Sequence, residues 1–328
     1  MAMYHPGLAK FLETYGIVVI VVAMMIGLTI MEPMVFLTPT NLTNIIKQNA
    51  SAALLALGMF VVVVTAGIDL SVGSVMALAM ITLAVANRAE LPWPVVIVVG
   101  PLVGIACGLV NGIGLTWLKL PHPFIMTLGT LNIARGLSNI VSGGAPISGL
   151  QPEVRFLGTA LIPFSATDPT IGLPASAILV AVSAIGLAYF LHRTSVGRHI
   201  YAIGGNPQAA RVSGISVDRV LVLVYALCGF FTGLAALLLA GRTNSGFPNA
   251  GIGAELDAIA AVIIGGASFF GGRGTVLGVL AGVLIIGLLR NGLNLLDVAV
   301  FWQQILIGLV IIAAVYMDVL RRRAAVRT

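Results

Sequence analysis

Long apolar runs alternate with short polar segments along the whole chain. A helix needs about 20 apolar residues to cross the hydrocarbon core of a bilayer. Ten runs come close to that length, at residues 15–31, 50–66, 71–87, 94–118, 123–142, 172–191, 217–241, 255–271, 275–296 and 300–319. The pattern predicts an all-α polytopic membrane protein with about ten transmembrane helices, forming a single transmembrane domain over residues 1–328.

Two of the apolar runs are interrupted by glycine, near Gly67 and near Gly265. Membrane helices tolerate such breaks when neighbouring segments satisfy the freed backbone groups. The first five and last five predicted spans would have opposite orientations, so the order is compatible with an inverted repeat of two five-helix halves. Sequence identity between the halves is too low to carry that argument further.

Composition supports the membrane assignment. Hydrophobic residues make up 59% of the chain and charged residues only 9%, whereas soluble domains have about 25% charged residues. The net charge of +6 comes from basic residues scattered between the spans, which does not suggest a nucleic-acid partner. Membrane lipid is the expected surrounding.

The distribution of Lys and Arg predicts the orientation, because cytoplasmic segments carry the excess of positive charge. With both termini cytoplasmic, the inner segments hold Lys10, Lys119, Arg193, Arg198, Arg211, Arg219, Arg273, Arg321, Arg322, Arg323 and Arg327. The outer segments hold Lys47, Arg88, Arg155 and Arg242. This topology puts residues 204–215 in the cytoplasm and residues 143–171 in a periplasmic loop, and it predicts a multi-pass protein of the bacterial inner membrane.

The cytoplasmic segment GGNPQAARVSG, residues 204–214, has the pattern of a short capped helix. Asn206 suits the N-cap, Pro207 suits the first helical position, and Gly214 can end the helix in the left-handed conformation. About two turns of helix are unstable alone in water. Either the rest of the chain or a partner protein must therefore stabilise it.

The segment GIDLSVGS, residues 67–74, places Asp69 and Ser71 between two apolar runs. An acidic side chain at the centre of a membrane helix costs roughly 2.5–3.5 kcal/mol on insertion scales, so Asp69 needs partners. One interpretation is a broken helix that lines a solute pathway. The other is a capping Asp whose carboxylate is satisfied by nearby backbone amides.

Three sets of polar residues share one helical face each, because their spacing is i, i+3 or i+4, and i+7. They are Asn132, Arg135 and Asn139; Arg290, Asn294 and Asp297; and Asn41, Asn44 and Gln48. In the predicted topology all three lie in the outer half of the membrane. They would line a hydrophilic pathway for an uncharged polar solute, or make hydrogen bonds between helices.

No pattern of catalytic residues or metal ligands emerges. The four histidines have no metal-binding spacing, and the turn at 271–274, GGRG, lacks the ending of a phosphate-binding loop. We therefore expect neither an enzyme nor a cofactor or metal on this chain.

Four segments together resemble the ribose-type sugar permeases of ATP-binding-cassette importers, and the likeness covers essentially the whole chain. They are GIDLSVGS at 67–74, PFIMTLGTLNIARGL at 123–137, GGNPQAARVSGI at 204–215, and ELDAIAAVIIGGASFFGGRGTVLGVLAGVL at 255–284. The third is similar to the EAA---G loop of importer permeases, with Gln208 in place of Glu. The first has a different form in the related branched-chain amino-acid permeases, so the sugar branch is favoured.

The resemblance implies a permease subunit that moves a pentose, hexose or related polyol. A cytoplasmic ATPase would bind ATP and dock on the coupling helix, carried over here to Gly204, Gly205, Asn206, Pro207, Gln208, Ala209, Ala210, Arg211 and Gly214. A periplasmic or lipid-anchored protein would deliver the sugar. A second copy of the chain, or a close paralogue, would complete the pathway, for which the candidate residues are Asp69, Ser71, Asn44, Gln48, Asn132, Arg135, Asn139, Arg290 and Asn294.

Two other classes remain open on the residues alone. An ion-coupled secondary transporter would need a network of ionisable groups near the midplane, for which Asp69 is the candidate. A passive channel for small polar solutes would need neither ATP nor a binding protein. Neither the identity of the solute nor the choice between homodimer and heterodimer follows from the sequence.

Overall fold

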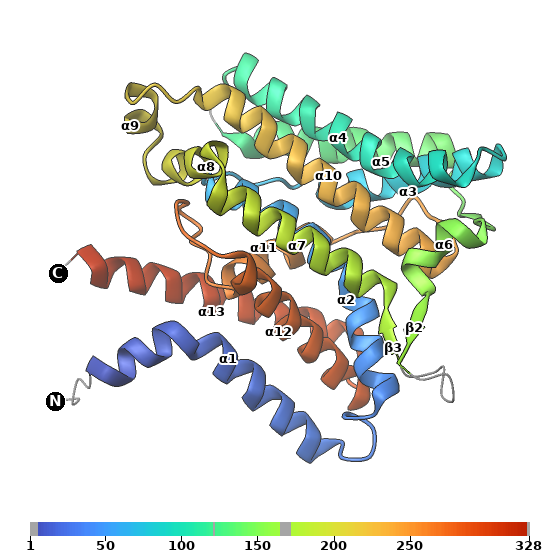
Figure 1. Cartoon of the computed structure of the whole chain (residues 1–328), viewed down its shortest axis with the longest axis horizontal. Coiled ribbons are helices and arrows are strands. Elements are labelled where there is room, and N and C mark those ends of the chain that lie inside the picture. The colour runs from blue at the N-terminus through green and yellow to red at the C-terminus, as the bar shows by residue number, and fades with distance from the viewer. Residues whose placement is uncertain (1–5, 121, 165–171, 327–328) are drawn as a thin grey trace.

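The computed structural model describes residues 6–120, 122–164 and 172–326 as a long helical bundle (Figure 1). The elements are α1 (Pro6–Met31), α2 (Pro39–Val64), α3 (Val72–Arg88), α4 (Trp93–Trp117), α5 (Pro123–Ser142), β1 (Ile147–Ser148), α6 (Pro152–Thr159), β2 (Leu161–Pro163), β3 (Gly172–Pro174), α7 (Ala175–Arg193), α8 (Ser195–Gly205), α9 (Pro207–Val212), α10 (Val217–Thr243), β4 (Ser245–Gly246), α11 (Ala254–Ile264), α12 (Val276–Leu295) and α13 (Val300–Val326).

Five of these helices are long and apolar enough to cross a membrane, namely α2, α4, α7, α10 and α12. Shorter apolar stretches occupy 16–31 in α1, α3, and 300–316 in α13. The chain is thus a helical multi-pass membrane protein, as its apolar pattern predicts. The strands are only two or three residues long and form two ribbons, β1 with β4 and β2 with β3.

Four predicted boundaries were wrong by more than five residues. Helix α1 begins at Pro6 and not at residue 15, and α13 ends at Val326 and not at residue 319. Helix α2 begins at Pro39 and not at residue 50, because Thr38 caps it by accepting a hydrogen bond from the Asn41 amide. Helix α11 ends at Ile264, although the apolar run continues to residue 271. Gly266 has a φ of 85°, which stops the helix, and 11 residues of helix span only about half of a hydrocarbon core.

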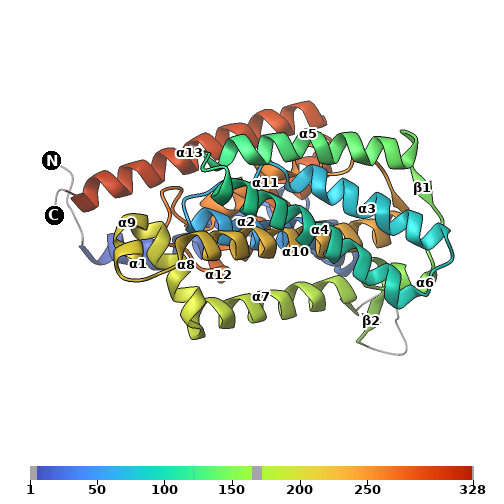
Figure 2. The same cartoon turned by 90° about the horizontal axis from the view of Figure 1, so that it is seen from above.

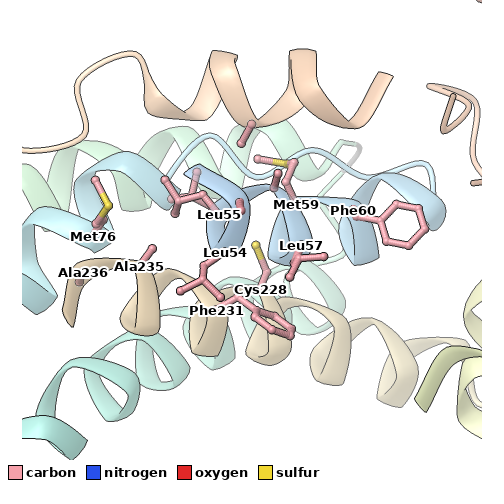
Figure 3. Close-up of a cluster of buried hydrophobic side chains, with 14 of the residues drawn as sticks. Leu54, Leu55, Leu57, Met59, Phe60, Met76, Cys228, Phe231, Ala235 and Ala236 are labelled. Carbon is pink, nitrogen blue, oxygen red and sulfur yellow. The ribbon is translucent and has the colours of Figure 1, made fainter. Parts of the chain in front are cut away.

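The core is built around α10, which packs against α4 on one side and α2 on the other. Figure 3 shows Leu54 and Leu57 of α2 beside Cys228 and Phe231 of α10 in this buried cluster. Small residues let the two helices approach closely: a Cβ on Gly58 would lie 3.0 Å from the Cys228 carbonyl oxygen.

The α4–α10 contact is a seam of glycines on both helices. Glycine recurs every fourth residue on α4, at Gly100, Gly104, Gly108 and Gly112. A Cβ on Gly104 would collide with the Gly229 carbonyl oxygen, and a Cβ on Gly229 would collide with the Gly104 carbonyl oxygen. Backbone-to-backbone packing of this kind is how membrane helices gain van der Waals contact without a hydrophobic driving force.

The bundle has two distinct ends. Helices α8 and α9 lie at one end, together with the start of α1 and the end of α13 (Figure 1). Helix α6 and the two ribbons lie at the other, where the Asn87 side chain donates to the Gly149 carbonyl oxygen. Within 143–171, the described residues therefore form ordered structure; residues 165–171 lie outside the described part. Seen from above, α5 and α13 run along one side of the bundle and α7 along the opposite side (Figure 2).

Candidate functional site

Helix α9 has the capped form that its sequence predicts. The Asn206 side-chain oxygen accepts hydrogen bonds from the amides of Gln208 and Ala209, each at 3.0 Å, and Pro207 occupies the first turn. Gly214 has a φ of 83°, and the next amide, of Ile215, returns to the Ala210 carbonyl oxygen at 3.1 Å. These bonds satisfy backbone groups that a six-residue helix would otherwise leave free.

Helix α9 presents almost all of its surface to the outside. Only Ala210 is buried, with 4% of its surface exposed. Pro207, Gln208, Ala209 and Arg211 are exposed, and Val212 is 90% exposed. Val212 was missed by the sequence reasoning, although an apolar residue in a polar loop is itself a signal. The result is a small protruding surface with an apolar tip.

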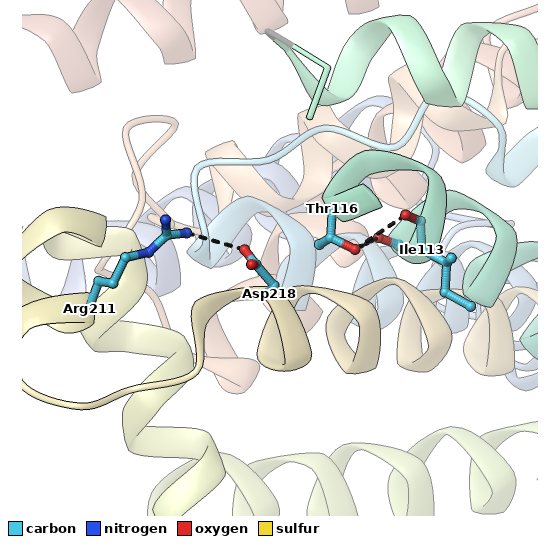
Figure 4. A network of polar contacts seen from close by, with 5 residues as sticks. Ile113, Thr116, Arg211 and Asp218 are labelled. Atoms are coloured by element: carbon cyan, nitrogen blue, oxygen red, sulfur yellow. Dashed lines mark hydrogen bonds and ion pairs between the residues drawn. The ribbon is translucent and has the colours of Figure 1, made fainter. Parts of the chain in front are cut away.

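One ion pair holds α9 near the start of α10. The Arg211 guanidinium points to the Asp218 carboxylate, 3.2 Å away (Figure 4), and both side chains are about two-thirds exposed, at 66% and 65%. An exposed pair of this kind contributes roughly 0–1 kcal/mol. It positions the loop between the two helices but cannot fix it rigidly.

Helix α8 anchors α9 to the bundle. Ile200 and Ile203 are buried, and the Tyr201 hydroxyl donates to the Gly274 carbonyl oxygen at 3.0 Å. Burial raises the pKa of the Tyr201 phenol above its ordinary value, so the group remains a hydrogen-bond donor at neutral pH. The anchor therefore reaches the turn between α11 and α12.

A second candidate site is a polar layer around the start of α11. Arg135 of α5 donates to the carbonyl oxygens of Pro248 and Ala250, the latter at 2.8 Å. Arg290 of α12 pairs with Asp257 at 2.7 Å. Arg135 thus contacts the segment just before α11, and Arg290 contacts the first turn of α11 itself.

Two acidic residues of this polar layer were not among the predicted site residues. Glu255 and Asp257 occupy the first turn of α11, where negative charge is favoured by the helix dipole. Glu255 is half-buried and interacts electrostatically with Arg135. Their position in ELDAIAA, directly before an apolar run, is the signal that could have identified them.

The other predicted pathway residues do not join the polar layer. The Asn139 amide donates to the Arg135 carbonyl oxygen of its own helix at 2.9 Å. Asn294 accepts a bond from Gln303 of α13 at 2.8 Å. Asn132 is exposed on α5 and donates to Leu128.

On α2, Asn41 exchanges bonds with Asn291 of α12, at 2.8 and 3.2 Å. Asn44 and Gln48 are exposed farther along α2. In the part of the chain that the structure describes, no hydrogen bond or ion pair connects these two side chains to Arg135, Glu255 or Arg290.

Asp69 and Ser71 lie in an enclosed cluster between α2 and α3. Asp69 is only 2% exposed, and it accepts bonds from the Ser71 amide at 2.9 Å and the Ser71 hydroxyl at 2.6 Å. Asn111 of α4 donates to the Ser71 hydroxyl oxygen at 2.9 Å. Asp69 thus accepts from a single backbone amide, two residues ahead, while Ser71 is the N-cap residue of α3 and makes no side-chain cap bond. Within the described chain the carboxylate is enclosed.

No group of three or more His, Cys, Asp or Glu side chains within the described ranges could hold a metal ion. The side chains of the polar layer supply hydrogen-bond donors, acceptors and paired charges.

Comparison with known proteins gives one family and close relatives. Residues 41–315 match the family described as branched-chain amino acid transport system / permease component. The ribose import permease protein RbsC of Bacillus subtilis (strain 168) is 42% identical over 97% of this chain and 94% of its own. The D-allose transport system permease protein AlsC of Escherichia coli (strain K12) is 38% identical over 94% and 93%. The galactose/methyl galactoside import permease protein MglC of the same strain is 36% identical over 98% of both chains. No solved structure matches.

Proposed function

Because the chain belongs to the family of permease components of branched-chain amino acid transport systems, we propose that it is the permease subunit of an ATP-binding-cassette importer for a sugar. The observation that carries this proposal is that import permeases for ribose, allose and galactose match it over nearly its whole length. The chain itself is a transporter subunit and not an enzyme. ATP is hydrolysed on a separate ATPase chain, and a periplasmic or lipid-anchored binding protein delivers the sugar.

The ATPase docks on the coupling surface, defined here as Gly205, Asn206, helix α9 and Gly214, all of which follow the buried Gly204. Two observations support this. Helix α9 is too short to be stable alone, and its exposed apolar tip at Val212 lies at the end of the bundle where no lipid would cover it. A groove on the ATPase that takes up α9 would bury Val212 and face Gln208 and Arg211.

The placement of charge and elements supports the orientation with both termini in the cytoplasm. With α8 and α9 cytoplasmic, the start of α1 and the end of α13 are cytoplasmic as well, and α6 with the two ribbons is periplasmic (Figure 1). Ten membrane segments are counted if short α11 and α3 each complete one crossing with the irregular segments beside them. The glycine-containing breaks after α2 and after α11 fit two inverted halves.

The solute pathway runs along the face between α5 and α13, where a second copy of the chain packs. Two observations support this: Arg290 of α12 is 46% exposed, and Leu256 of α11 is also exposed. A charged side chain at membrane depth faces water or protein and not lipid. On α5, Gly129 and Gly136 leave open space beside exposed Asn132, which suits the close approach of another helix.

The test is transport by the complex purified from native membranes and placed in liposomes. Labelled ribose, allose and galactose are tested as solutes, with leucine as the comparison solute. ATP is supplied on the side of the membrane that carries the ATPase. We expect ATP-dependent uptake of a sugar and no uptake of leucine. Uptake that persists without ATP, or uptake of leucine alone, would contradict the proposal.

A further inference from the structure

Three chain segments that are far apart in the sequence meet by backbone contact at the inner end of the bundle. They are the end of α2 at 64–66, the joint between α8 and α9 at Gly204, and the turn at 271–274. We call this meeting point the glycine junction. The Val64 carbonyl oxygen accepts a hydrogen bond from the Gly272 amide at 2.8 Å.

The glycine junction has no room for side chains. A Cβ on Gly204 would collide with the Val64 carbonyl oxygen, and it would lie 2.5 Å from the Gly272 amide nitrogen. A Cβ on Gly271 would lie 2.8 Å from the Gly204 carbonyl oxygen and 2.9 Å from the Ala66 amide nitrogen. Backbone atoms yield less than flexible side chains, so the three segments are closely constrained to one another.

The junction lies directly beside both breaks in the bundle. After Val64 the chain leaves helix α2, and Ala66 has a φ of 59°. Three residues later it enters the enclosed Asp69 cluster, where the Tyr225 hydroxyl reaches the Ile68 carbonyl oxygen at 3.4 Å. On the other side, the 271–274 turn joins short α11 to α12 and is also held by Asp318 of α13, which accepts from the Ser268 hydroxyl at 3.3 Å.

The chain that leaves the junction at residues 65–71 leads to the polar layer. Helix α3 starts at Val72, and a Cβ on Gly73 would collide with the Gly251 carbonyl oxygen and the Glu255 carboxylate. A shift of residues 65–71 therefore moves the start of α3 against the start of α11. By contrast, α9 is joined to α10 through an exposed loop and the exposed Arg211–Asp218 pair. This connection constrains the position of α9 relative to α10 only weakly.

We infer that the glycine junction, through Gly204, Val64 and Gly272, transmits movement of the coupling surface to both broken helices and so to the polar layer around Glu255. This inference rests on the proposed docking of an ATPase at α9. Gly204 and Tyr201 are positioning residues in this scheme, because they touch neither ATP nor solute. They determine how many solute molecules are moved per ATP hydrolysed.

The test measures ATP hydrolysis and solute uptake in the same liposomes containing the whole complex, with both rates normalised to assembled permease. Gly204→Ala adds one methyl group at the junction and leaves α9 unchanged. We expect the ATPase to remain bound and the solute molecules moved per ATP to fall roughly fivefold or more, as for loss of a typical coupling between sites. Gly186→Ala, at an exposed helical glycine with open space on α7, is the control and keeps the wild-type ratio.

Tyr201→Phe is the milder variant in case Gly204→Ala fails to assemble. It keeps the ring and removes only the hydroxyl bond to Gly274, so we expect the ratio to fall about twofold to fivefold, as for one lost hydrogen bond. A wild-type ratio in Tyr201→Phe and in any assembled Gly204→Ala complex would overturn the inference. Val212→Asp separates the two proposals: if this variant still binds the ATPase fully, docking at α9 is wrong whatever the ratios show.

Discussion

Glycine brings backbones together in two regions of this protein, and the two regions differ in what they hold. In the α4–α10 seam, Gly100 and Gly104 of α4 pack against the backbone of Gly229 and Gly233, and the next two glycines of the seam pack against the backbone near Tyr225 and Val222. In the glycine junction, Gly204 meets the irregular backbone at Val64 and Gly272. The seam is spread over four turns and lies inside the bundle, whereas the junction is a single crossing point beside two helix breaks.

The difference indicates that the seam stabilises the fold and that the junction couples the movement of one segment to another. A contact repeated along two continuous helices adds many small van der Waals gains and resists bending, so the seam belongs to the rigid frame. A contact at one point between chain ends adds little to stability but fixes how one segment follows another. Changes in the seam should therefore affect folding first, and changes in the junction should affect coupling first.

The largest expected effect comes from Gly104→Leu in the seam. The added side chain must displace the α10 backbone at Gly229, and overpacking of this kind costs typically 1–3 kcal/mol and sometimes more. We expect the yield of monodisperse permease in detergent to fall sharply, measured by size-exclusion chromatography. Gly186→Leu is the matched control, because its space is open; an equal loss in both variants would show that the seam is not special.

The next effect is expected at the polar layer. Glu255→Gln keeps the size of the side chain and removes the negative charge beside Arg135. If the layer contacts the solute, uptake should fall about tenfold, the range for a hydrogen bond to a charged group. ATPase co-purification and basal ATP hydrolysis should not change. Normal uptake in this variant would show that the Glu255 carboxylate does not contact the solute.

A smaller effect is expected at the cap of α9. Asn206→Ala removes the acceptor for two backbone amides and should destabilise the helix by about 0.5–2 kcal/mol. The affinity for the ATPase should then fall between about twofold and thirtyfold, measured by titration of detergent-solubilised permease. Asn206→Asp and Asn206→Ser retain a capping oxygen and should restore binding. Equal weakening by all three substitutions would mean that the amide itself contacts the ATPase.

The smallest effect is expected at the exposed ion pair. Arg211→Gln removes the partner of Asp218, whose contribution is at most about 1 kcal/mol. The melting temperature of the solubilised chain should change by no more than about 2–4 °C, and by less in high salt. A larger change would show that the loop between α9 and α10 is stiffer than its exposure indicates, and would weaken the contrast with the junction.

Local signals made part of this structure predictable from sequence. Helix α5 spans Pro123–Ser142 as its apolar run predicts, because Pro123 starts it and Gly143 ends it with a φ of 65°. The cap of α9 was equally local. In both cases the residues that determine the conformation are within a few positions of the element they shape.

Other features depend on contacts that no local pattern records. The start of α2 is polar, so hydropathy missed its first eleven residues, 39–49. The apolar run continues from α11 into residues 265–271, so hydropathy does not show where the helix ends. The conformation of Gly266 marks the break. Asn111 contacts Ser71 across 40 positions, and the junction joins residues near 64, 204 and 272. Such pairs are visible only once the bundle is assembled.

Capture of the tagged full-length chain from native membranes tests the central claim most directly, with mass spectrometry of what co-purifies. The account predicts an ATPase subunit with the wild-type chain and with Gly186→Ala, and at least about tenfold less of it with Val212→Asp, which puts a charge at the centre of the docking surface. Equal amounts of ATPase with Val212→Asp, or a wild-type chain that carries no ATPase at all, would contradict it.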